Sequence, residues 1–339
     1  MGLRDLLHQR RLARAASSVA ELYLLRSGLE LGLFELLREP LREAVLIERA
    51  GLEPELLRAW LRAAAAHGLL RRPHHPSDAW QCGALPRWIG DSARAAGLRA
   101  VIDQALETQQ PIWRRLPELL RGAPRPAFAD PAAVARAAAI SRLSERAARS
   151  ALRRVPGVDK ALRMLDVGCG EGALLADFLA QRRDAQGVGI ELDPHLALRA
   201  RQEIARLQVS RRAEILQGDF MSSEIPGSFD LVLFHHNLYY FPPARWPFVF
   251  ARVMSRLKPA GTAVFGLPVA ATGLAARASG FSRALADFDL FLRCHSNLHG
   301  LPEPEALERA LRDAGFREVG ALPILPGGLE RFVFARAPD

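Results

Sequence analysis

Three carboxylates in the second half of the chain follow short apolar segments and stand close to glycines. Asp166 lies two residues before the first glycine of a turn, where it can hold an ammonium group directly or through water. Glu191 lies 19 residues beyond Gly172, a distance at which a carboxylate can accept both hydroxyls of a ribose. Asp219 follows another short apolar segment and can bond an adenine amino group. Together these residues favour a nucleoside ligand.

The turn that follows Asp166 is rich in glycine and reads Gly168-Cys169-Gly170-Glu171-Gly172-Ala173. Glycines let a ligand approach the backbone closely, and the N-terminus of the next helix is a binding edge. The turn satisfies the dinucleotide pattern as well as the nucleoside pattern. A dehydrogenase is therefore an alternative, although its fold has no need of Asp219.

Short apolar segments alternate with helical patterns around this turn, which predicts an α/β unit with a mostly parallel sheet. The expected strands cover 164–168, 187–191, 213–216, 229–234 and 262–267. The expected helices cover 173–180 and 305–314, and two last strands follow at 319–324 and 331–334.

The stretches LDVGCGEG, VGIELDP, LQGDF, FDLVLF and LKPAG occur in that order. This series resembles the class I S-adenosylmethionine-dependent methyltransferases over residues 161–336, with Ala260 in place of one glycine of the last motif. The resemblance implies a Rossmann-like sheet whose last strand is antiparallel, with S-adenosylmethionine as cofactor. The residues that it places at the cofactor are Asp166, Gly168, Gly170, Glu191, Leu192, Asp219 and Phe220. Leu192 and Phe220 would hold the adenine between them, and we expect His235 to line the cofactor because strand ends face the ligand crevice.

The expected acid/base residues depart from that family. The family's usual histidine aligns with Tyr239 and its supporting glutamate with Gly300. A tyrosine has an ordinary pKa near 10 and is a poor base at neutral pH. Candidates to accept a proton are therefore His236 and His299, beside Tyr239, while a structural role for each histidine is the alternative. His295 lies in the same region, and no metal site is expected.

The first half of the chain consists of successive helical patterns. Apolar residues recur at three- and four-residue spacing between Val19 and Leu36, Gly51 ends a short second helix, and Glu53-Pro54 opens a third. Turn residues around short apolar segments in 69–88 are typical of a β-wing. This succession predicts a winged helix, whose third helix has few polar side chains for DNA bases.

The whole chain resembles two-domain small-molecule O-methyltransferases, through SGLELGLFELL, EPELLRAWLRAAAAHGLL and PIWRRLPELLRG. The resemblance implies a dimerisation and substrate-lid domain over 1–156 and a catalytic domain over 157–339, in a homodimer. The expected substrate is a small aromatic or polyketide-like molecule that is methylated on oxygen, with carbon or nitrogen as alternative acceptors. Two other functions stay open: a reaction without methyl transfer on the same cofactor, and a winged-helix DNA-binding regulator.

Composition and charge narrow the class of protein. The chain has 339 residues and a net charge of +9, and its 46 basic residues include only two lysines, Lys160 and Lys258. All of the excess positive charge lies in residues 1–160, spread over helices rather than gathered in a patch. We therefore expect neither a nucleic-acid nor a membrane partner. Three cysteines, an Arg-containing start without an apolar run, and the absence of a membrane-length segment fit a cytoplasmic protein.

Overall fold

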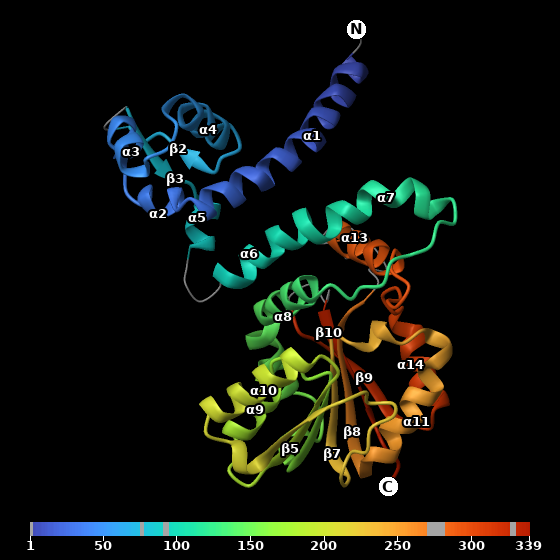
Figure 1. Ribbon diagram of the computed structural model, residues 1–339. Coiled ribbons are helices and arrows are strands. Elements are labelled where there is room, and N and C mark those ends of the chain that lie inside the picture. The colour runs from blue at the N-terminus through green and yellow to red at the C-terminus, as the bar shows by residue number, and fades with distance from the viewer. Residues whose placement is uncertain (1–2, 75–77, 91–94, 270–281, 326–329) are drawn as a thin grey trace. The chain divides into compact units, whose positions relative to one another are not determined.

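A computed structural model describes residues 3–74, 78–90, 95–269, 282–325 and 330–339 (Figure 1). The chain forms two compact units, Met1–Pro111 and Ile112–Asp339. The units divide earlier than the domain boundary predicted near residue 156, because residues 112–156 pack against the second unit. Ala148, Ala151 and Leu152 belong to the same buried cluster as Leu175 and Phe178. No helix among the described residues is long and apolar enough to cross a membrane.

The first unit consists of a long first helix and several shorter helices with a small antiparallel sheet. Its helices are α1 (Leu3–Glu30), α2 (Leu33–Leu36), α3 (Glu43–Ala50), α4 (Pro54–Ala66), α5 (Ala84–Ile89) and α6 (Ala95–Asp103). Its strands are β1 (Leu41–Arg42), β2 (Leu70–Arg71) and β3 (Ala79–Cys82), in the order β1-β3-β2. The helices expected to end at Gly51 and to begin at Pro54 are present, and β2 pairs with β3 within the segment expected to form a wing. A π-helical segment, Gln104–Gln109, joins α6 to α7 (Gln110–Leu120), which crosses the boundary between the units.

The second unit contains a seven-stranded sheet in the order β6-β5-β4-β7-β8-β10-β9. The strands are β4 (Arg163–Val167), β5 (Gln186–Glu191), β6 (Ala213–Gln217), β7 (Phe229–His235), β8 (Leu257–Pro268), β9 (Arg317–Pro323) and β10 (Glu330–Arg336). The first five are parallel to one another, whereas β10 is antiparallel to β8 and β9. The predicted strands and the antiparallel last strand are confirmed, although β8 begins earlier than expected.

Helices cover both faces of this sheet. The helices of the unit are α8 (Pro131–Leu152), α9 (Ala173–Ala180), α10 (Pro194–Arg206), α11 (Trp246–Arg256), α13 (Ser282–Arg293) and α14 (Pro304–Asp313). Figure 1 shows α8, α9 and α10 beside one face and α11 and α14 beside the other. Side chains alternate across each strand, so Met164 packs with the α8–α10 layer and Leu165 with the α11–α14 layer. Acidic residues cap α8 and α10: Asp130 and Asp193 each accept backbone N–H groups of the first turn, and a proline follows each.

Arg212 closes the end of α9 from a distant part of the chain. Its guanidinium donates to the carbonyl oxygens of Leu179, Arg182 and Ala185 at 2.9, 2.6 and 3.0 Å. The Leu179 carbonyl lies in the last turn of α9, and those of Arg182 and Ala185 lie in the loop that follows it. A charged donor suits this negative end of the helix.

We expect Arg212→Ala to lower the free energy of unfolding by roughly 2–3 kcal/mol, because three buried or half-buried acceptors lose a charged donor. Urea unfolding followed by circular dichroism measures the loss. The neighbouring Arg211 is exposed, so Arg211→Ala is the matched control and should change the free energy by less than about 0.5 kcal/mol. Equal losses in the two variants would show that the cap contributes nothing.

Candidate active site

The predicted site residues gather at one edge of the large sheet. Asp166, Glu191 and His235 lie at or near the carboxyl ends of β4, β5 and β7, which run parallel in adjacent positions. The chain leaves β4 toward β5 on one side and later returns to β7 on the other, so β4 marks a switch in strand order. Ligands of open α/β sheets bind in the crevice at such a point.

Asp166 is a buried carboxyl group whose surroundings disfavour its charge. It is 2% exposed, and burial together with the like charge of Glu191 raises its pKa to about 8. Glu191 is also buried, and burial raises its pKa as well. The Glu191 carboxylate accepts the backbone N–H groups of Gly170 at 2.8 Å and Asp193 at 3.0 Å. It thereby ties the glycine turn to the end of β5.

The glycine turn has a backbone conformation that explains its composition. Gly168, Gly170 and Gly172 have φ values of 61°, 56° and 78°, in the left-handed region. The N–H groups of Gly168 and Cys169 donate to the carbonyl of Ile190 at 2.8 and 3.2 Å. On the other side of the turn the Asn237 amide donates to the Val167 carbonyl.

The three residues predicted at the adenine have different environments. Leu192 is 69% exposed, so its side chain is accessible to an apolar ligand. Asp219 is exposed, and its Oδ1 accepts the N–H of Met221 at 2.8 Å, so its carboxylate caps a turn and leaves its second oxygen available. Phe220 is 4% exposed, and its ring packs edge-on against Phe234 with the centroids 5.3 Å apart. Its side chain therefore belongs to the core and offers little surface to an adenine.

A cluster of two histidines and a glutamate forms where β7 ends. The imidazoles of His235 and His236 are stacked, with centroids 4.2 Å apart and planes 14° apart. Consecutive strand residues point to opposite faces, but His236 has a φ of 58°, and this left-handed conformation returns its ring to the side of His235. His236 Nε2 lies 2.7 Å from Glu330 Oε1, and His235 Nε2 lies 3.5 Å from the same oxygen.

Glu330 is the site residue that sequence reasoning missed. It lies 94 residues beyond His236, at the first position of β10. Because β10 is antiparallel, its first residue lies at the edge where β7 ends. A carboxylate at the start of the predicted last strand, in a sheet expected to close with an antiparallel strand, was the available signal.

Electrostatics sets the charge states of this cluster. Burial lowers the pKa of His235 to about 4, assisted by His236, so His235 is neutral at pH 7. Burial opposes ionisation of Glu330, but its interactions with the two histidines outweigh burial and hold its pKa well below the ordinary range. Glu330 is therefore a carboxylate. The ligand atoms of these three side chains lie within 4.8 Å of one another, close enough for a metal ion, and the expectation of no metal site stays a prediction.

The remaining candidates lie around the 3₁₀ turn Leu238–Tyr240. Burial raises the pKa of Tyr239 well above its ordinary value. Its phenol therefore keeps its proton at neutral pH and cannot act as a base. The His299 N–H donates to the Tyr239 carbonyl at 2.8 Å, so these two residues are neighbours, and burial lowers the pKa of the His299 ring. His295 is 4% exposed, packed against Phe128 and Phe291, with Nδ1 2.8 Å from the Phe291 carbonyl. These contacts favour a structural role for His295.

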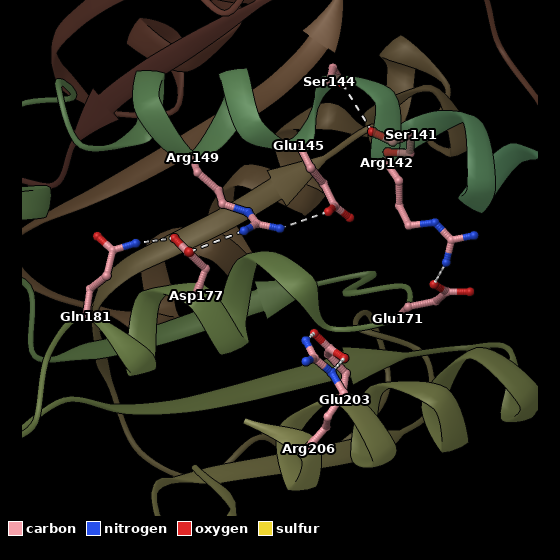
Figure 2. Close-up of polar contacts among 10 residues, drawn as sticks. All are labelled: Ser141, Arg142, Ser144, Glu145, Arg149, Glu171, Asp177, Gln181, Glu203 and Arg206. Atoms are coloured by element: carbon pink, nitrogen blue, oxygen red, sulfur yellow. Dashed lines mark hydrogen bonds and ion pairs between the residues drawn. The ribbon is translucent and has the colours of Figure 1, made fainter. Parts of the chain in front are cut away.

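Helix α8 connects the glycine turn with the histidine cluster. Figure 2 shows Arg142 paired with Glu171 of the turn, and Arg149 paired with Asp177 of α9 and with Glu145 on its own helix. Glu171 also pairs with Arg199 of α10 at 2.9 Å. On another face of the same helix, the Ser141 hydroxyl lies 3.1 Å from His236 Nδ1, and the Ser144 hydroxyl donates to Glu330 Oε1 at 3.2 Å.

Comparison with known proteins agrees with this geometry. Residues 164–261 match the family model of a methyltransferase domain. A release factor glutamine methyltransferase of Caulobacter vibrioides is 40% identical over 73 residues, which are 22% of this chain and 25% of that protein. The chain therefore spans about a quarter of that relative's length.

Two further relatives match over most of the chain. The tetracenomycin polyketide synthesis 8-O-methyl transferase of Streptomyces glaucescens is 26% identical over 253 residues, covering 69% of this chain and 71% of that protein. The structure of human N-acetylserotonin methyltransferase in complex with S-adenosylmethionine superimposes with a TM-score of 0.76 at 18% identity, over all of both chains. Residues 164–261 thus match a methyltransferase domain, and the chain has the same fold as the N-acetylserotonin methyltransferase structure.

Proposed function

We propose that the protein is an S-adenosylmethionine-dependent methyltransferase that acts on a hydroxyl of a small aromatic or polyketide-like molecule. The observation that carries the proposal is the pair of buried carboxylates, Asp166 and Glu191, beside the glycine turn at the switch point of the sheet. The substrate class is supported by the relatives named for tetracenomycin polyketide synthesis and for N-acetylserotonin.

The residues present fit this cofactor. The charge that faces Asp166 is the like charge of Glu191, and the cationic ammonium of S-adenosylmethionine would relieve that repulsion. Glu191 would accept the ribose hydroxyls, Gly168 and Gly170 would let the ligand approach the backbone, and Leu192 would contact the adenine. Asp219 would bond the adenine amino group through its second oxygen, and His235 would line the crevice. When bound, S-adenosylmethionine supplies a methyl group on a positively charged sulfur, already activated for transfer.

We also infer a homodimer formed through the N-terminal half of the chain, in the cytoplasm. Helix α1 exposes large apolar residues along its length, among them Leu7, Leu12, Val19 and Tyr23, which are 46–72% exposed. A second copy of the chain would bury them. All three cysteines are free thiols, as a reducing compartment would keep them.

A DNA-binding function is less well supported by the same unit. A DNA reader needs free polar side chains on the helix that enters the groove. On α4, Arg58 is paired with Glu43 at 3.1 Å, and His67 beyond its end lies 3.6 Å from Glu21. Few side chains are left to contact bases, so we infer no nucleic-acid partner.

Calorimetric titration with S-adenosylmethionine tests the proposal. We expect the wild type to bind and Asp166→Ala to lose most of its affinity, while the exposed Asp184→Asn serves as the matched control and binds as the wild type does. Absence of binding, or binding that Asp166→Ala leaves unchanged, would reject the proposal.

Incubation with radiolabelled donor and a panel of hydroxylated aromatic compounds then separates methyl transfer from other reactions on the same cofactor. A product heavier by one CH₂ supports transfer. A consumed acceptor with no methyl gain would assign the fold a non-methylating reaction instead.

A further inference from the structure

We propose that Glu330 is the positioning residue that makes His236 the proton acceptor of the methyl transfer, by holding its imidazole with Nε2 protonated and Nδ1 free. The inference rests on the proposed function. It assigns a proton acceptor to a chain in which the positions of the family's usual histidine and glutamate are occupied by Tyr239 and Gly300.

The pair is held from two different elements. Glu330 is 6% exposed at the start of β10, and its Oε1 accepts from His236 Nε2 at 2.7 Å and from the Ser144 hydroxyl of α8 at 3.2 Å. The backbone of His236 is fixed as well, because its N–H donates to the Gly266 carbonyl of β8 at 2.7 Å. Both partners are therefore placed by the sheet rather than by a loose loop.

The hydrogen-bond chemistry determines the tautomer. A carboxylate only accepts hydrogen bonds, so the bond between Glu330 and His236 requires the proton on Nε2. In the neutral ring Nδ1 then carries a lone pair, and the Ser141 hydroxyl, 3.1 Å away, donates to it. The described titratable neighbours of His236 are Glu330 and the stacked His235, while α8 contributes the hydroxyls of Ser141 and Ser144.

This arrangement gives the substrate proton a destination. A substrate hydroxyl that bonds the Ser141 oxygen would pass its proton to Ser141 as Ser141 passes its own to His236 Nδ1. The O–H bonds of the substrate and of Ser141 would break, while a new Ser141 O–H bond and one N–H bond on His236 would form. The electron pair left on the substrate oxygen would form the O–C bond to the methyl group as the S–C bond breaks, and the sulfonium would leave as a neutral thioether. The imidazolium that results is stabilised by the Glu330 carboxylate and later releases its proton to water.

The first test needs no acceptor. In protein labelled with ¹⁵N-histidine and saturated with S-adenosylhomocysteine, imidazole NMR reports which nitrogen of His236 carries the proton, with His236→Asn identifying the signal. We expect the Nε2–H tautomer in the wild type and in Ser141→Ala, which removes only the hydroxyl at Nδ1. We expect a tautomer mixture in Glu330→Gln. A wild-type ring protonated at Nδ1, or a Glu330→Gln spectrum identical to the wild type, would overturn the proposal.

The second test uses an acceptor found in the panel. We expect Glu330→Gln to lower kcat by roughly 10²-fold or more with little change in KM, and to move the acidic limb of the pH profile to lower pH, because the stabilising carboxylate is gone. Glu330→Asp keeps a carboxylate and should retain more activity, and its pH limb should stay near that of the wild type. A merely structural role would lower activity without moving the limb.

Controls separate this proposal from the proposed function. Glu318 lies on the neighbouring strand β9 and pairs with Arg336 at the surface, so Glu318→Gln should leave tautomer and pH limb unchanged. Binding of S-adenosylmethionine shows whether each variant is folded. Wild-type protein that binds no cofactor rejects the proposed function, whereas normal binding and transfer with an unmoved pH limb in Glu330→Gln rejects only the role of Glu330.

Discussion

Binding of S-adenosylmethionine is expected to tighten as the pH rises from 6 to 8 and to release a proton. Asp166 has a pKa of about 8 in the free protein, so its carboxyl is mostly protonated at pH 6–7. The ammonium group of the ligand favours the ionised form, and the complex therefore binds fewer protons than the free protein. By linkage the dissociation constant should fall by up to about tenfold per pH unit below pH 8 and level off above it.

Titrations in buffers of different ionisation enthalpy measure this proton. We expect a release approaching one proton at pH 6.5 in the wild type and in the control Asp184→Asn. Asp166→Asn cannot ionise, so it should bind weakly and with a flatter pH dependence. A proton release of the same size in Asp166→Asn would place the titrating group elsewhere, with Glu191 as the next carboxyl to replace.

Gly168→Ala is expected to lower the free energy of unfolding by roughly 2–5 kcal/mol. The left-handed conformation at Gly168 costs a residue with a Cβ about 1–2 kcal/mol. A Cβ there would also lie 2.5 Å from Asn237 Nδ2, which donates to the Val167 carbonyl, and displacing that amide costs about 1–3 kcal/mol more.

Gly170→Ala is the matched control for this prediction. Gly170 has nearly the same backbone conformation, but a Cβ there meets nothing within 4 Å. It should therefore cost only the conformational strain. Urea unfolding of both variants isolates the Asn237 contact as their difference, and equal losses would mean that Asn237 moves aside freely.

Local patterns in the sequence were sufficient to predict most of the catalytic unit. The strands that contain Asp166 and Glu191 are short apolar runs, as expected of strands that a parallel sheet buries on both faces. In the first unit, the helix start at Pro54 likewise follows from an acidic cap and a proline, which act within one turn. Such signals depend only on residues that are close together in the sequence.

Other features depend on tertiary contacts that a pattern does not contain. The family resemblance implied that Phe220 contacts the adenine, whereas in the structure its ring packs against Phe234. The partnership of His236 with Glu330 needs both the closing antiparallel strand and a left-handed φ in a non-glycine residue, which sequence propensity disfavours. Helix α8 packs against α9 through an Ala-rich face that includes Ala148 and Ala151. In sequence this face resembles an ordinary solvated surface.

Helix α8 contacts both parts of the proposed site. Its salt bridge to Glu171 holds the turn that is expected to bind the methyl donor. Ser141 and Ser144 of the same helix contact the proposed proton acceptor, His236, and its partner Glu330. A slide of one residue along a helix moves every side chain by about 1.5 Å, enough to break hydrogen bonds at both places. We therefore expect the glycine turn and the His236–Glu330 pair to gain or lose their contacts with α8 together.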